Sequence, residues 1–190
     1  MQSFVNHNYM NRVLLILAAA IMTASSLSAQ VLQKASQRME LATVETEIGG
    51  YETAEMEVFQ MRDSGTYWLS VGHLGIGSDL VQLQFDPLFE LFIPLGNSLE
   101  EALAKMKELQ AFYKKPRLST MEVQGCLAAM YPGDNFEPVT VTSRRLLGAK
   151  ILSFSVQRED LVRATYITKV DFGSLVFSLK SYKALHPKEK

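Results

Sequence analysis

Apolar and polar residues alternate with a period of two in the part of the chain that follows Gly49-Gly50. This alternation is typical of antiparallel strands that bury one face. Turn residues interrupt it at Asp63-Ser64-Gly65 and at Asp86-Pro87, and three glycines mark a connection between them. The pattern therefore predicts four strands, at residues 52–62, 66–73, 80–85 and 88–93, of which the first two form a hairpin.

The period then changes to that of a helix. Ser98-Leu-Glu-Glu101 has the form of a capping box, in which the serine oxygen accepts a free amide and the glutamate reaches back. The apolar residues that follow recur at helical spacing: Leu99, Ala102, Leu103, Met106, Leu109, Phe112 and Tyr113. We expect this amphipathic helix to end at Lys114-Lys115-Pro116, because proline cannot continue it and cations suit its C-terminal end.

The same order of elements occurs again in the second half. Alternation predicts strands at residues 119–130, 139–146, 150–157 and 161–169. After them Asp171 can cap a helix in which Phe172, Leu175 and Val176 begin an apolar stripe that continues to Leu179 and Tyr182. Residues 174–182 as a fifth strand are the alternative, because Gly173 and Phe177 do not favour a helix.

The predicted fold is α+β, with two successive ββββα units at residues 51–115 and 116–185 and a tail at 186–190. We expect the two units to pack as one interlocked domain with a pseudo-two-fold axis. Residues 30–50 precede the first unit as an N-terminal arm, for which a helix, a strand and a mobile segment all remain open. Chance similarity of the two halves is the alternative to a duplication.

This order of elements resembles the ββββα repeat of Pur-alpha-type and Whirly-type proteins over residues 51–185. The resemblance is one of topology only, since no residue motif of those families is present. It implies single-stranded nucleic acid as a ligand, bound by basic grooves and stacked aromatic rings. Here the aromatic residues follow strand patterns that predict burial, namely Phe85, Phe89, Phe92, Phe154 and Tyr166, and we do not expect nucleic acid as a partner.

Residues 1–29 are predicted to be an export signal. Arg12 precedes an apolar run of about ten residues ending at Met22, and Ser28-Ala29 offers a cleavage site before Gln30. Translation can begin at Met1 or at Met10. The run is too short for a membrane span, and no later one is long enough. The single cysteine excludes an intramolecular disulfide, which favours the periplasm of a Gram-negative bacterium, with secretion as the second choice.

Charge divides the remaining chain into two unlike halves. Residues 30–115 hold 7 basic and 13 acidic side chains, a net charge of −6, and residues 116–190 hold 11 basic and 7 acidic ones, a net charge of +4. Two ordinary solvated faces are one interpretation of this asymmetry. The other is a basic surface for a phosphate, a sulfate, an acidic glycan or an acidic partner, formed by Arg144, Arg145, Lys150, Arg158, Arg163 and Lys169.

Catalytic signatures are absent from the sequence. His73 is expected at a strand end and His186 in the tail, and neither has the companions that a zinc site or a general base requires. Cys126 lies among apolar residues and is expected to be a buried structural thiol. We therefore expect no catalytic residue, metal or cofactor. The sequence favours an exported binding or interaction module, monomeric or homodimeric, whose partner is a protein or a small anion. A hydrolase with a site formed only by the fold is the remaining alternative.

Overall fold

The computed structural model describes residues 37–48, 51–72, 74–78, 81–86, 89–158 and 161–187. Contacts divide the chain into two units, residues 1–37 and 38–190, and every element described below belongs to the second. The predicted export signal at 1–29 and the prediction for His73 lie outside the described residues.

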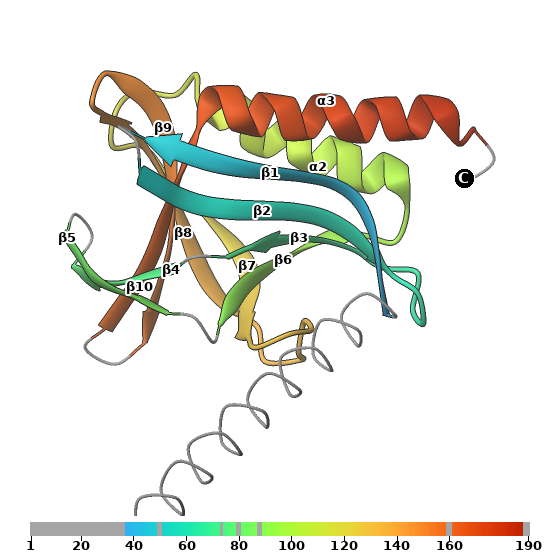
Figure 1. Ribbon diagram of the computed structural model, residues 1–190, viewed down its shortest axis with the longest axis horizontal. Coiled ribbons are helices and arrows are strands. Elements are labelled where there is room, and N and C mark those ends of the chain that lie inside the picture. Colours follow the sequence, from blue (N-terminus) through green and yellow to red (C-terminus); the bar gives the residue numbers. More distant parts are fainter. Residues whose placement is uncertain are drawn as a thin grey trace, which may run out of the picture. The chain divides into compact units, whose positions relative to one another are not determined.

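The described strands form one antiparallel sheet (Figure 1). Its first four strands follow one another in space as a meander: β1 (Arg38–Ile48), β2 (Tyr51–Met61), β3 (Tyr67–Val71) and β6 (Glu90–Gly96). The next four pair in chain order: β7 (Thr120–Ala128), β8 (Glu137–Leu146), β9 (Ala149–Arg158) and β10 (Leu161–Thr168). A short register between β6 and β7, from Glu90↔Ala128 to Phe92↔Cys126, joins the two runs. β1 and β2 also contact β10, so the sheet curls on itself.

A hairpin leaves the first run and extends the second. β4 (Leu74–Ser78) and β5 (Val81–Asp86) lie between β3 and β6 in the chain, yet β4 pairs with β10, from Val162↔Gly77 to Ala164↔Gly75. The predicted strand at 80–85 exists, but its expected place in the first meander is wrong. The glycine-containing segment before it is itself a strand, β4, which pairs with β10 on one side and with β5 on the other.

One strand occupies the segment that the sequence left open. β1 pairs along its whole length with β2, from Arg38↔Met61 to Ile48↔Tyr51. Its inward residues Leu41 and Ala42 are buried, and so is Thr46. A register shift between Glu40 and Ala42 interrupts the two-residue alternation of this strand.

Two helices cover one face of the sheet, and Figure 1 shows them side by side. α2 (Leu99–Phe112) begins as predicted: Ser98 Oγ accepts the Glu101 amide at 3.2 Å, and Glu101 Oε2 accepts the Asn97 amide at 2.7 Å. α3 (Lys169–Leu185) confirms the helix over the alternative strand. In the part of the chain that the structure describes, no helix is long and apolar enough to cross a membrane.

The cap predicted for the second helix is wrong by three residues. Thr168 is the N-cap of α3, and its Oγ1 accepts the Asp171 amide at 3.1 Å. Asp171 lies in the first turn, where a carboxylate also suits the positive end of the helix dipole. Threonine and aspartate both cap well, so the pattern alone did not separate them.

The described residues form three apolar clusters, of which the smallest consists of Ile151 and Tyr166. The pleat of the strands separates the other two. The larger lies between sheet and helices and includes Leu69, Ile93, Phe154 and Phe172. The smaller lies on the opposite face and contains Phe59, Met61, Phe92 and Cys126. Of the predicted core aromatics, Phe92 and Phe154 are fully buried and Tyr166 is 7% exposed, while Phe89 is partly buried; the Phe85 side chain is outside the described set.

Candidate functional site

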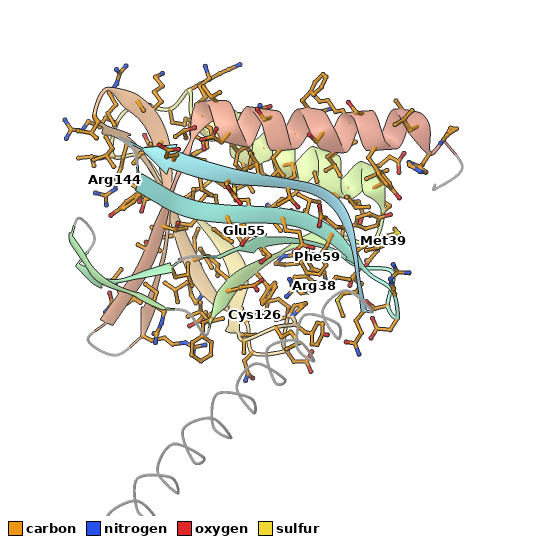
Figure 2. The ribbon with its side chains drawn as sticks, viewed as in Figure 1. Arg38, Met39, Glu55, Phe59, Cys126 and Arg144 are labelled. Carbon is orange, nitrogen blue, oxygen red and sulfur yellow. The ribbon has the colours of Figure 1, made fainter. Side chains whose placement is uncertain are left out.

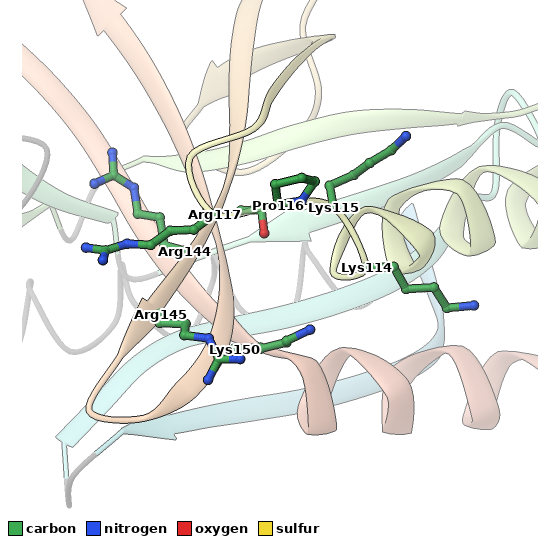
Figure 3. A pocket seen from close by; sticks show the side chains of 8 residues that line it. Lys114, Lys115, Pro116, Arg117, Arg144, Arg145 and Lys150 are labelled. Atoms are coloured by element: carbon green, nitrogen blue, oxygen red, sulfur yellow. The ribbon is translucent and has the colours of Figure 1, made fainter.

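A pocket lined by six cationic side chains lies where the end of α2 meets the β8–β9 hairpin (Figure 3). Its volume is about 310 Å³. Its lining is Lys114, Lys115, Pro116, Arg117, Ser143, Arg144, Arg145 and Lys150. No lining residue is acidic. We call this the basic pocket.

The loop after α2 forms one wall of the basic pocket. Pro116 prevents the helix from continuing, and the last amides turn back to Gln110, Ala111 and Phe112 carbonyls. The Leu118 amide donates to the Ser143 carbonyl at 2.7 Å, and the Ser143 amide donates to the Ser119 carbonyl at 2.9 Å. These two bonds attach the loop to β8 and so fix the cations of the loop beside those of the strand.

A buried tyrosine anchors the same end of α2. The Tyr113 hydroxyl donates to the carbonyls of Ile167 and Thr168, at 2.9 and 3.1 Å, which joins the helix end to β10. Burial, followed by the nearby Asp171 carboxylate, raises the pKa of Tyr113 well above its ordinary value, so it remains a neutral donor. Lys150 Nζ approaches the Tyr113 carbonyl at 3.5 Å.

The opposite wall is the β8–β9 hairpin. Arg145 and Lys150 face each other across its strands, and the next pair closes a two-residue turn, Leu147-Gly148. Both turn residues have positive φ, 47° and 84°, which the tight type I′ hairpin requires. The turn thus places Arg145 and Lys150 on neighbouring strands, and Figure 3 shows their side chains next to each other.

The predicted basic surface is only partly brought together. Arg144, Arg145 and Lys150 line the basic pocket. Lys169 is exposed and directly follows Thr168, which pairs with Ile151, so its backbone lies near Lys150. It is not among the residues that line the pocket.

Arg158 and Arg163 lie elsewhere. Arg158, near the other end of β9, forms a two-bond ion pair with Glu137, at 2.9 and 2.6 Å. Arg163 lies on β10, with its guanidinium 5.7 Å from the ring centre of Phe89. The sequence predicts that Arg158 and Arg163 share one surface with Arg144. The strand register does not favour this, because both lie far from Arg144 along their strands.

The sequence missed the other half of the pocket. In the sequence Lys114 and Lys115 indicate only the end of a helix, and Arg117 has no distinguishing pattern, yet all three line the pocket. The available signal was their position: three cations flank the proline that ends α2. Only the fold brings that segment beside β8.

A second pocket lies on the outer face of strands β7 to β10, with a volume of about 460 Å³. Its lining is mainly neutral and polar: Leu118, Thr120, Thr140, Thr142, Arg144, Ser155, Gln157 and Val162. Arg144 lines both pockets, and the 114–119 loop contributes to both. We call this one the hydroxyl pocket.

A separate charged cluster surrounds Arg38 on the face opposite the helices (Figure 2). Arg38 is 3% exposed, and its Nη1 lies 3.3 Å from Glu57 and 3.1 Å from Glu90. The guanidinium carbon lies 4.5 and 4.9 Å from the ring centres of Phe59 and Phe92. Two carboxylates and two ring faces compensate the buried charge, so this cluster has the character of a structural anchor.

Cys126 is buried beside the Arg38 cluster, as the sequence predicted. Burial raises the pKa of its thiol, which disfavours the reactive thiolate. His186 is exposed and stacks on Tyr182, with ring centres 4.1 Å apart. Among the described residues, no three His, Cys, Asp or Glu side chains gather as metal ligands would.

Comparisons of the chain with protein-family models, with curated proteins and with solved structures found no match.

Proposed function

We propose that this is an exported, non-enzymatic binding protein that holds a small anionic ligand in the basic pocket. One observation carries the proposal: six cations line a pocket of about 310 Å³ to which no carboxylate contributes. Cationic side chains around a pocket favour a bound anion over a bound cation.

Cations elsewhere in the described chain show the kind of acceptor that such groups bind in this protein. Arg38 pairs with Glu57 and Glu90, Arg158 pairs with Glu137, and Lys183 lies 2.6 Å from Glu100. In the basic pocket the acceptors beside the cations include main-chain carbonyls such as that of Tyr113. A phosphate, sulfate or carboxylate would supply the acceptor oxygens that guanidinium groups bind best.

The chemistry of the lining supports binding over catalysis. Neither the basic pocket nor the hydroxyl pocket is lined by a carboxylate, a histidine or a cysteine. A hydrolase needs a nucleophile with an adjacent base, or a pair of acid and base groups, within reach of one substrate. Lysine and arginine side chains can hold an anion by hydrogen bonds and charge alone.

The test compares two charge-matched double variants. Arg144→Glu with Arg145→Glu reverses two pocket cations, whereas Arg62→Glu with Lys180→Glu makes the same change in net charge at exposed residues outside the pocket lining. Calorimetric titration with inorganic sulfate and phosphate measures affinity. We expect at least a tenfold loss in the pocket variant and little change in its control. Equal affinities in the two variants would reject the site.

We also propose that the two runs of strands are the two ββββα units of one duplicated, interlocked domain. The element order supports this, since β1-β2-β3-β6 precedes α2 and β7-β8-β9-β10 precedes α3. The β4–β5 hairpin, which departs from the first run and pairs with β10, would be the interlocking element. The resemblance to Pur-alpha-type and Whirly-type repeats remains one of topology, and it carries no nucleic-acid function here.

A further inference from the structure

We infer that the ligand is a sugar bearing an anionic group, a uronate or a sulfate or phosphate ester, with its anion in the basic pocket and its hydroxyls in the hydroxyl pocket. The inference rests on the proposed function and names the class of molecule that fits both pockets. A bare anion would use only one of them. The argument begins with how the two pockets are joined.

Arg144 connects the pockets. Of the residues that the structure describes, it is the one that lines both, and it lies between the cationic end of β8 and the threonines of the same strand. Alternation along β8 places Thr140, Thr142 and Arg144 on one face of the sheet, opposite the face that carries Val139 and Val141 into the main core. A ligand held by Arg144 therefore extends directly along this row.

Strand register turns the row into a polar surface with regular spacing. Thr142 faces Thr120 on β7, and Thr140 faces Ser155 on β9. Residues opposed in this way have Cβ atoms about 4.5–5.5 Å apart. Hydroxyl groups at such intervals can both donate and accept, as a run of sugar hydroxyls requires. Lysine and glutamate, which would bind charge instead, do not line this pocket.

The pocket also carries two apolar residues, Leu118 and Val162. A sugar ring presents C–H groups as well as hydroxyls, so a mixed lining suits it better than a wholly polar one. Ligand pockets in general combine apolar walls with a few fixed polar groups.

The wall between the pockets is rigidly held. Leu118 has a φ of 65°. This left-handed conformation is energetically unfavourable for any residue that has a Cβ atom. Hydrogen bonds to Ser143 on one side of it and from Ser119 to Pro116 on the other maintain this conformation. A wall held in place before binding reduces the entropy that a ligand loses on binding.

The experiment is calorimetric titration of the purified protein with matched probes. The pairs are glucose 6-phosphate against inorganic phosphate, and glucuronate against acetate, with glucose alone as the neutral member. We expect the sugar member of at least one pair to bind ten times or more tighter than its bare anion. The pair that shows the gain distinguishes an ester from a uronate.

The variant that tests the hydroxyl pocket is Thr120→Val with Thr140→Val. Both threonines are exposed on strands, and valine keeps the β-branched shape, so folding is preserved. We expect the tenfold gain to disappear while inorganic phosphate binds as before. Thr43→Val, at an exposed position on β1, is the matched control.

The outcomes separate the two proposals. If inorganic phosphate binds but neither sugar adds affinity, or if the double variant keeps the gain, the sugar inference is overturned and the anion site stands. If no anionic probe binds at all, both are overturned. If glucose alone binds as tightly as its anionic forms, the basic pocket has no part in recognition and the inference again fails.

Discussion

Replacement of Arg38 by methionine tests whether the buried ion-pair cluster anchors the first strand. Methionine keeps a long apolar side chain against Phe59 and Phe92 but removes the positive charge. Glu57 and Glu90, whose side chains are 14% and 21% exposed, then lose the Arg38 guanidinium as a partner. We expect the free energy of unfolding to fall, because two partly buried carboxylates lose this cation.

The magnitude follows from the burial. Removing one member of a buried ion pair costs about 3–5 kcal/mol, and the partial exposure of the two carboxylates indicates the lower end, about 3 kcal/mol. For a chain of this size each kcal/mol lowers the melting temperature by about 2–4 °C. We therefore expect a decrease of roughly 6–12 °C. A loss of about 3 kcal/mol is substantial beside the roughly 5–15 kcal/mol that stabilises a typical domain.

The assay is urea unfolding followed by tryptophan fluorescence. Trp68 is the single tryptophan of the chain. It packs against the small apolar cluster that contains Phe59 and Phe92, so its emission reports on this face of the sheet. Lys183→Met is the control. The side chains of its ion pair with Glu100 are 40% and 49% exposed, and exposed pairs contribute only about 0.2–1 kcal/mol.

A rescue separates charge from packing. Adding Glu57→Gln and Glu90→Gln to Arg38→Met removes these carboxylates, and we expect more than half of the lost stability to return. A loss below about 1 kcal/mol for Arg38→Met, or one equal to that of Lys183→Met, would refute the reasoning. Failure of the rescue would show that packing, and not charge, holds the cluster together.

Two further predictions concern the end of α2 and the relation of the two halves. Tyr113→Phe removes the hydroxyl that donates to Ile167 and Thr168, and it should cost about 1–2 kcal/mol at neutral pH. Because the folded-state pKa of Tyr113 is raised above the ordinary 10.0, the wild-type protein loses stability as pH rises through that value; the deficit of the variant should shrink in urea unfolding near pH 11, and a constant deficit would contradict this. The interlocked arrangement predicts that a fragment of residues 30–115 does not fold alone, since its β6 pairs with β7 and its β4 with β10; a cooperative thermal transition in that fragment would contradict it.

Local patterns in the sequence determined most elements of this protein. The capping box and the apolar stripe place α2 correctly, because helix caps and helical spacing depend on neighbours a few residues apart. The strands of the second half follow their alternation closely, and the helix at its end is present. Burial of Cys126 also follows from its apolar neighbours.

Pairing between distant segments lies beyond such patterns. The alternation at 80–85 indicates a strand but does not indicate which strand it pairs with. In the structure this strand, β5, pairs with β4 and not with a strand of the first meander. The sequence left a helix, a strand and a mobile segment open for β1, in which Glu40, Glu45 and Glu47 are exposed. The start of β1 is held by the ion pair between Arg38 and Glu90, which lies far away in the chain.

The candidate site divides in the same way. The sequence alone identified a surplus of cations in the second half and named Arg144, Arg145 and Lys150 among them. It could not separate them from Arg158, because only the register shows that Arg158 lies at the far end of its strand beside Glu137. Nor could it add Arg117, which reaches the pocket through the attachment of its loop to β8. Charge is a property of residues, whereas a pocket is made by long-range contacts, and only the tertiary structure decides those.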